Sequence, residues 1–200
     1  MPVLAKNRAK LTLKPAAPSL FLSGPASVLS EHRGIMFPIQ PDITYSQSVA
    51  YAPYDLVHTN YTFNAYRNTP SPDIQLTAQF ASVTDDEARY TFGVLHFLRS
   101  VTKMFFGMAQ TQPAAGTPPP VLQFSAFGER QFNNIPVVVS QFSTTYDSNV
   151  DLKLLDGDTQ IPAMMNMFIQ LTVQQNPDRQ KMQFTTNDFI SGNAYKQGFI

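Results

Sequence analysis

The sequence predicts a mainly β protein with one long α-helix, an extended N-terminal arm and a C-terminal tail. Its 200 residues include 16 Phe, 16 Pro and no Trp, and only 14% are charged, which is typical of β-rich chains with many turns. Runs of alternating apolar and polar residues recur along the chain, whereas only residues 84–106 carry apolar side chains at helical spacing. We therefore expect one β domain over residues 34–180, between an arm (1–33) and a tail (181–200).

The helix expected over residues 84–106 has a well-defined start. Thr84 can cap the first turn and Glu87 can reach back to it, which makes a capping box, and the acidic first turn favours the positive end of the helix dipole. We expect Gly107 to end the helix. Apolar side chains cover most of its circumference, so it should lie against a large apolar surface. A narrow polar stripe remains, through Arg89, His96, Ser100 and Lys103.

A β-hairpin is predicted from residues 58–66 and 73–82, joined by a proline-containing turn at 68–72. Both strands alternate, which gives the hairpin one apolar face and one neutral polar face. The apolar face comprises Tyr61, Phe63, Ala65, Ile74, Leu76, Ala78 and Phe80. The neutral polar face, which is the candidate functional surface, comprises Asn60, Thr62, Asn64, Gln75, Thr77 and Gln79.

Further strands are predicted after the helix. Residues 121–127 and 135–146 should form a second hairpin around a turn at 128–134. The run 165–174 also alternates, with Phe168 as the one break. The segments predicted to lack regular structure are a low-complexity loop at 110–120 and a polar connector at 147–160.

The N-terminal arm is predicted to be extended because residues 1–33 mix Lys, Ala, Pro and Ser without a sustained period. Four of its cations precede the first acid, Glu31, and we expect them to dock in an acidic groove of a partner protein, since no aromatic residues are interleaved for nucleic-acid binding. These cations are Lys6, Arg8, Lys10 and Lys14. Removal of residues 1–20 should then leave the core folded. The tail, whose apolar residues follow no period, is expected to dock onto another surface.

No combination of residues indicates an enzyme. The chain has no Cys, which excludes a thiolate nucleophile and cysteine-ligated metals, and its 3 His show no metal-ligand spacing. Asp156 and Asp158 flank a glycine but lack the other ligands of a calcium loop, so they predict a turn. Neither a phosphate-binding glycine loop nor a nucleophile elbow is present. We therefore expect no catalytic activity, no metal and no cofactor.

Charge and hydropathy bear on the partners. The formal net charge is zero, which gives no reason to expect a nucleic acid or an anionic membrane from bulk charge. The sequence also contains no apolar run long enough to span a membrane. A protein whose surface carries mostly neutral polar side chains is more typical of assemblies with other proteins.

From Asn60 onward, a series of segments appears in an order and spacing typical of one protein family. The segments are YTFNAYRN, DIQLTAQF, TDDEARYTFGVLHFLRSVTKMFFG, PPPVLQFSAFG, IPVVVSQFSTTYDSNVDL, IPAMMNMFIQLTVQQNP and FISGNAYKQGFI. In these segments the chain resembles the small tube-initiating baseplate proteins of contractile-tailed bacteriophages, which join the central hub to the tail tube. None of the segments is catalytic, and no lysozyme-like or peptidase-like stretch accompanies them.

This resemblance implies an antiparallel β-barrel or sandwich of the tail-tube type, flanked by one helix and assembled into a homohexameric ring. It implies as partners the baseplate hub protein, the tail tube protein, and the tape-measure protein or DNA that passes through the lumen. The protein would then belong to the tail of the virion and assemble in the host cytoplasm. The neutral polar face would line the channel, where cationic walls would hold phosphate and anionic walls would repel it.

Three alternatives remain open at the level of sequence. The chain could be a monomeric β-sandwich that binds another protein, with polar strand faces that merely meet water. It could be another tube or baseplate ring protein of a phage-derived contractile machine. An enzyme without any of the usual residue combinations is the third alternative.

Overall fold

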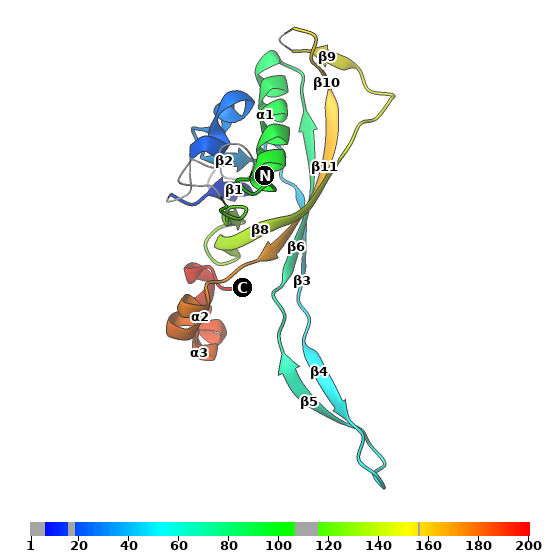
Figure 1. Ribbon diagram of the computed structural model, residues 1–200, viewed down its shortest axis with the longest axis vertical. Coiled ribbons are helices and arrows are strands. Elements are labelled where there is room, and N and C mark those ends of the chain that lie inside the picture. Colours follow the sequence, from blue (N-terminus) through cyan, green and yellow to red (C-terminus); the bar gives the residue numbers. More distant parts are fainter. Residues whose placement is uncertain (1–6, 16–18, 107–115, 156) are drawn as a thin grey trace.

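The fold is built around a seven-stranded antiparallel sheet (Figure 1). The computed structural model describes residues 7–15, 19–106, 116–155 and 157–200. In spatial order the strands are β2 (Gly34–Met36), β1 (Lys10–Leu13), β7 (Leu122–Ala126), β8 (Phe132–Thr145), β11 (Met164–Val173), β6 (Asp73–Ala81) and β3 (Asp42–Ser46). β2 and β3 are the two edges of this sheet, so it is open, and the expectation of a closed barrel is wrong.

The hydrophobic core lies between one face of the sheet and the helix α1 (Asp85–Val101). Alternate residues of β6 and β11 are fully buried on this face, as their patterns predict, and they meet the apolar side of α1. The side chains that α1 contributes are Ala88, Thr91, Val94, Leu95, Phe97, Leu98 and Val101. The sequence therefore identified the main packing layer of the protein, which is a long helix on an amphipathic sheet.

The start of α1 is the predicted capping box. The Thr84 hydroxyl accepts a hydrogen bond from the Glu87 amide at 3.3 Å, and the Glu87 carboxylate accepts one from the Thr84 amide at 2.9 Å. The helix ends earlier than predicted, at Val101. The Thr102 hydroxyl donates to the carbonyls of the last turn, which supplies partners for acceptors that would otherwise be orphaned. The predicted terminating residue, Gly107, lies outside the described residues.

The N-terminal segment is part of the core, so the prediction of an unpacked arm over residues 1–33 is wrong for the described residues. β1 lies between β2 and β7, with Leu11 opposite Ile35 on one side and Phe124 on the other. Leu11 is 0% exposed. Two 3₁₀ helices, η2 (Ser19–Leu22) and η3 (Gly24–Leu29), continue the segment over α1. Four residues of K-L-T-L are too short a run to show a strand pattern, which is why the sequence did not reveal β1.

Gly93 explains how η3 approaches α1 so closely. A Cβ at Gly93 would lie 2.6 Å from the Val28 side chain and 2.9 Å from the Pro25 carbonyl oxygen. Both distances are shorter than real Cβ contacts allow, and the second involves backbone that cannot simply rotate away. The glycine in the middle of the helix is therefore a packing requirement rather than a weak point.

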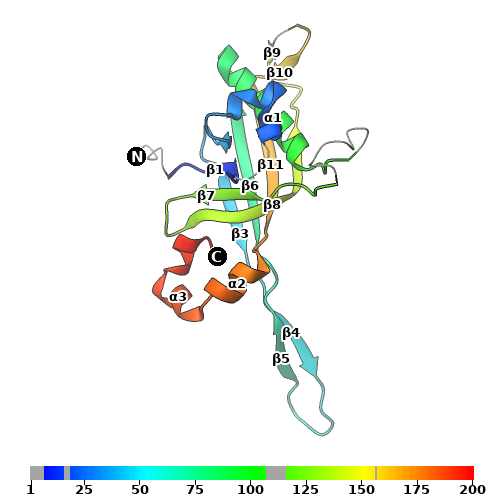
Figure 2. The same cartoon turned by 60° about the vertical axis from the view of Figure 1, so that its left-hand side comes forward.

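The predicted hairpin of residues 58–66 and 73–82 is wrong in its pairing. Instead, β4 (Ala50–Tyr54) pairs with β5 (Phe63–Asn68), while β6 pairs with β3 and β11. β4 and β5 form a two-stranded ribbon that projects away from the sheet, with residues 55–62 at its tip (Figures 1 and 2). The two prolines within residues 69–72 have no backbone N–H to donate to a strand ladder. They therefore interrupt the chain between β5 and β6, instead of forming a hairpin turn that would pair these two strands.

The second half of the chain follows the predictions more closely. β7 and β8 form the predicted hairpin, and β11 covers the predicted strand. The segment expected to be a polar connector contains a small hairpin, β9 (Leu152–Leu154) with β10 (Gln160–Pro162). The expected low-complexity loop at 110–120 lies partly outside the described residues.

The C-terminal tail folds back onto its own chain, contrary to the expectation of one helix and a tail docked elsewhere. It contains α2 (Pro177–Gln183), α3 (Thr186–Ser191) and a 3₁₀ helix, η4 (Ala194–Gln197). Asn133 donates to the Lys196 carbonyl at 3.0 Å, and Phe199 is buried. The tail thus docks on the beginning of β8.

Thr84→Ala should lower the free energy of unfolding by about 1 kcal/mol, because the Glu87 amide loses its cap. Chemical denaturation monitored by circular dichroism measures this change. Thr102→Ala, at the other end of the same helix, shows whether the loss is specific to the N-terminal box. A denaturation midpoint equal to that of the wild type would contradict the assigned start of α1.

The capping box should also depend on pH. The hydrogen bond from the Thr84 amide is the largest cause that lowers the pKa of Glu87 below its ordinary value of 4.5. Because the pKa is lower in the folded state, this stabilisation is complete above about pH 4.5 and is lost as the pH falls through the folded-state pKa. Glu87→Gln should therefore be less stable than the wild type at pH 7, and the two stabilities should converge as the pH falls through the folded-state pKa of Glu87. A difference in unfolding free energy that stays constant with pH would argue against this role.

Leu11→Ala should lower the free energy of unfolding by about 2–5 kcal/mol, the usual result of truncating a fully buried leucine. Thr12→Ala on the same strand, with a side chain that is only partly buried, is the matched control and should lower it by less than about 1 kcal/mol. Equal and small effects in both variants would restore the interpretation of an unpacked arm.

Candidate functional site

A largely polar surface is formed by the face of the sheet that points away from α1. We call this surface the outer face, and it is formed by β3, β6, β11 and the second half of β8. Its side chains are those that alternate with the buried ones along each strand. They are Thr44, Gln75, Thr77, Gln79, Gln141, Ser143, Thr145, Asn166, Phe168 and Gln170.

The strand register arranges these side chains in rows across the sheet. Gln75 lies opposite Gln170, which lies opposite Gln141. Thr77, Phe168 and Ser143 form the next row, and Gln79, Asn166 and Thr145 form the third. Because directly opposed side chains in a sheet lie close together, each row is a continuous band of amides and hydroxyls, broken only by Phe168.

The charge of the outer face depends on the ionisable side chains of its four strands. None of the four strands includes a Lys or an Arg. Two carboxylates stand at its rim, Asp42 opposite Thr77 and Asp73 opposite Thr172. The Thr172 hydroxyl donates to the Asp73 carboxylate at 2.8 Å. The face therefore offers neutral hydrogen-bonding groups and no cation to a molecule that passes over it.

The two borders of the outer face are unpaired strands. β3 is an edge of the sheet, and β7 covers β8 only from Phe132 to Val137, so residues 138–145 have a ladder partner on one side alone among the described residues. The successive pairs β3–β6, β6–β11 and β11–β8 are all antiparallel. The two free borders consequently run in opposite directions and can pair with each other between copies in an antiparallel ladder.

The structure brings together only half of the residues predicted for the neutral polar face. Gln75, Thr77 and Gln79 lie on the outer face, as their alternation predicts. Asn60 and Thr62 lie instead in the tip of the ribbon, and Asn64 lies opposite Pro53 in β5. All six were expected on one hairpin face, but the ribbon carries the second group away from the sheet (Figure 1).

The predicted basic arm is also dispersed. Lys6 lies outside the described residues. Lys10 is a residue of β1, between Met36 and Ser125, and the Lys14 carbonyl accepts a hydrogen bond from Arg33 at 3.2 Å. Arg8 lines a surface cavity of about 500 Å³ together with the acidic first turn of α1. The role of these cations toward a partner stays a prediction.

The sequence contained a signal for the outer-face residues that the prediction did not use. Asn166 and Gln170 are the polar positions of the alternating run in β11, and Gln141, Ser143 and Thr145 alternate in the same way near the end of β8. What the pattern did not show was that these two strands and β6 are neighbours, since β6 and β11 are about 90 residues apart in the chain.

The described residues contain no group of three or more His, Asp or Glu placed to hold a metal ion. Tyr90 is a structural group, because its hydroxyl donates to the Met36 carbonyl at 2.7 Å and accepts from the Met36 amide at 2.9 Å, and burial raises its pKa. Within the part of the chain that the structure covers, no helix has the length and apolar character needed to cross a membrane.

Comparison with known proteins adds no family. No protein-family model matches the chain, and no curated protein is detectably similar to it in sequence. The arguments on function therefore start from the geometry of the outer face and its borders.

Proposed function

We propose that this chain is a structural subunit of a phage contractile tail, a ring-forming adapter that joins the baseplate hub to the tail tube. In this role the outer face lines the channel through which DNA or the tape-measure protein passes. The observation that carries the proposal is a four-stranded antiparallel surface that is polar, free of cations and open at both borders. The segment order that resembles tube-initiating baseplate proteins gives independent support.

The open borders support a ring. An exposed strand edge promotes uncontrolled association unless it is covered, and a closed ring covers every edge. In each copy β3 and residues 138–145 of β8 run in opposite directions, so β3 of one copy can continue the ladder of β8 in the next. Each contact joins two different edges, which is a heterologous contact, and such contacts close into rings when the rotation between copies allows it.

The chemistry of the outer face supports passage rather than binding. A wall with Lys or Arg would hold phosphates through counterion release, and the attraction would grow with every copy in the ring. Gln, Thr, Ser and Asn side chains interact with water as well as with a passing molecule, so they give no strong net attraction. The two rim carboxylates, Asp42 and Asp73, repel phosphate without placing charge in the middle of the face.

The second candidate is a monomeric β-sheet module that binds another protein, and the exposed aromatic side chains of the ribbon favour it. They include Tyr54, Phe63 and Tyr66, each more than half exposed. The native mass of the chain, alone and together with its neighbours in the tail, separates the two candidates. A ring, formed either by the chain alone or only together with its neighbours, would support the role of a ring-forming adapter. The same result is expected for a ring protein of a phage-derived contractile machine.

Gln75→Lys and Gln79→Lys should each fold with a stability within about 0.5 kcal/mol of the wild type, because both side chains lie opposite the buried face of β6. In an assembled ring the same change repeats in every copy and places a circle of like charges beside the DNA. We expect particles that eject DNA slowly or incompletely, or rings that fail to close.

The matched control is Gln131→Lys, which adds the same charge at an exposed turn away from the outer face. Ring assembly is measured by native mass and electron microscopy, and DNA delivery by the rate of ejection from particles. Normal assembly and normal ejection in both outer-face variants would exclude the outer face from the channel wall.

A further inference from the structure

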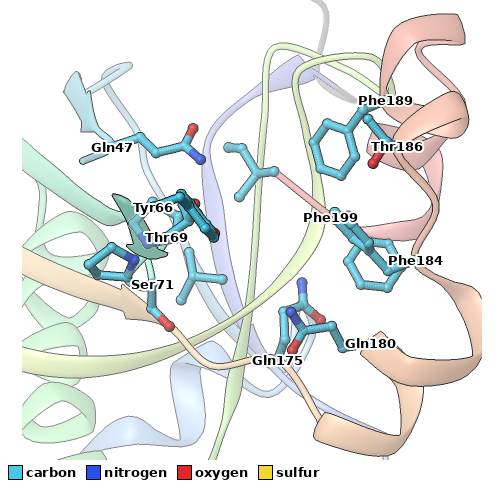
Figure 3. A pocket seen from close by; sticks show the side chains of 14 residues that line it. Gln47, Tyr66, Thr69, Ser71, Gln175, Gln180, Phe184, Thr186, Phe189 and Phe199 are labelled. Atoms are coloured by element: carbon cyan, nitrogen blue, oxygen red, sulfur yellow. The ribbon is translucent and has the colours of Figure 1, made fainter. Parts of the chain in front are cut away.

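A cleft of about 400 Å³ lies between the base of the ribbon and the C-terminal tail (Figure 3). Tyr66 and Pro72 belong to the wall on the ribbon side, and Phe184, Phe189 and Phe199 form the wall on the tail side. No side chain that lines the cleft is charged. Its size and its aromatic walls are typical of a site that receives a neutral, largely apolar group.

The tail wall is well ordered by contacts between its aromatic rings. The ring centroid of Phe184 lies 5.3 Å from that of Phe189 and 5.8 Å from that of Phe199. The Arg179 guanidinium lies 5.2 Å from the Phe199 ring centroid, on the ring face. These contacts hold the rings in place without an occupant, so the cleft is a preformed shape.

One polar atom of the cleft lacks a partner. The Gln175 side chain donates through Nε2 to the Gly198 carbonyl at 2.7 Å, which fixes the orientation of the amide. Its other atom, Oε1, is buried and has no hydrogen-bond partner. A buried acceptor without a donor costs free energy, so an occupant that carries one donor hydroxyl would satisfy the site.

The same chain presents such a group at the tip of the ribbon. Tyr61 is 83% exposed. Of the other ribbon tyrosines, Tyr51 and Tyr66 pack edge-on against each other with 6.2 Å between their ring centroids, and Tyr54 lies opposite Phe63 in the ribbon ladder. Among the described residues, the Tyr61 hydroxyl makes no hydrogen bond and its ring pairs with no other aromatic ring. A phenol is an apolar ring with one hydroxyl donor, which is the chemistry that the cleft lacks.

We propose that the cleft is a phenol-binding site occupied by Tyr61 from a second copy of this chain. The ring packs among Phe184, Phe189 and Phe199, and the hydroxyl donates to Gln175 Oε1. The side chains that line the cleft are uncharged, as are Tyr61, Leu56 and Val57 of the tip, and the one carboxylate of the tip, Asp55, accepts a hydrogen bond from Thr62. The tip of the same copy lies at the far end of the ribbon from α2 and α3 of its own tail (Figure 1).

The base of the ribbon can adjust its direction to such a partner. The sheet ladder ends at the pair Ser46 and Asp73, and the ribbon ladder resumes at Ala50 and Asn68. The residues between them include two prolines, which cannot donate to a ladder. Tip and cleft are different surfaces, so the contact is heterologous and can repeat around a ring. It does not require the outer face to line a channel.

Self-association of the isolated chain tests the contact. Sedimentation velocity over a concentration series up to about 1 mM should show concentration-dependent association of the wild type. Tyr61→Ala and Gln175→Leu should each weaken it about tenfold or more, and Tyr61→Phe should weaken it less than Tyr61→Ala, since only the hydroxyl is lost. Combining Tyr61→Phe with Gln175→Leu should add little to Gln175→Leu alone, because both changes remove the same hydrogen bond.

Met182→Ala is the matched control, because Met182 is an equally exposed residue of the tail that does not line the cleft. Circular dichroism verifies that every variant is folded. A mixture of the Tyr61→Ala and Gln175→Leu chains retains one intact contact and should form a dimer and nothing larger. In the same sedimentation series, Gln75→Lys and Gln79→Lys should associate like the wild type. A loss of association in the tip or cleft variants alone therefore reports on this contact and not on the proposed channel function.

Three results would overturn the proposal. The wild type could remain monomeric throughout the series, or associate with an affinity that neither cleft nor tip variants change. Tyr61-dependent binding to phosphatidylcholine vesicles without self-association would instead assign the ribbon tip to a lipid surface.

Discussion

The pairing of β6 with β11 is the constraint on which the rest of the structure depends. The two strands pair continuously from Ala81 with Met164 to Asp73 with Thr172. Within that ladder every inward residue of both strands is buried, and a slip of one residue would turn all of them toward solvent. The register is therefore fixed by hydrophobic burial, and α1 lies where it can cover the apolar side.

The same register creates the outer face. Because side chains alternate across a strand, burying one set exposes the other, and in this protein the exposed set contains no Lys, Arg or Glu along four neighbouring strands and has Asp42 and Asp73 only at its rim. A sheet face that only meets water commonly carries Lys and Glu, which also keep free edges from associating. The absence of such charges together with two open borders is consistent with a surface that is completed by further copies.

Unlike β6 and β11, the two strands of the ribbon are held by local cross-strand contacts and bury little of their side chains. An isolated two-stranded ribbon is at best marginally stable in water, and β4 and β5 expose tyrosine and phenylalanine without a covering layer from the described chain. Cross-strand pairs such as Tyr51 with Tyr66 hold it together locally. Full burial of these rings therefore requires a partner chain.

The sequence by itself determined those features whose physical cause lies within a few neighbouring residues. The capping box of α1 is local, as are the alternation in β6 and β11 and the turn between β7 and β8, and all of them formed where predicted. For the same reason Gln75, Thr77 and Gln79 were assigned correctly to a solvent-facing side of a strand. The side of a strand follows from the period of two, which needs no knowledge of its neighbours.

Only the tertiary structure decided which segments meet. β1 gains its burial from β7, more than a hundred residues later in the chain, and four residues cannot reveal such a partner. The prolines of residues 69–72 suggested a hairpin turn between β5 and β6. In the structure β6 pairs with β3 and β5 pairs with β4, so these prolines lie in the break between the two ladders. Asn60, Thr62 and Asn64 were separated from the outer face for that reason. Pairing depends on the total area that distant segments bury together, and a local pattern does not contain that quantity.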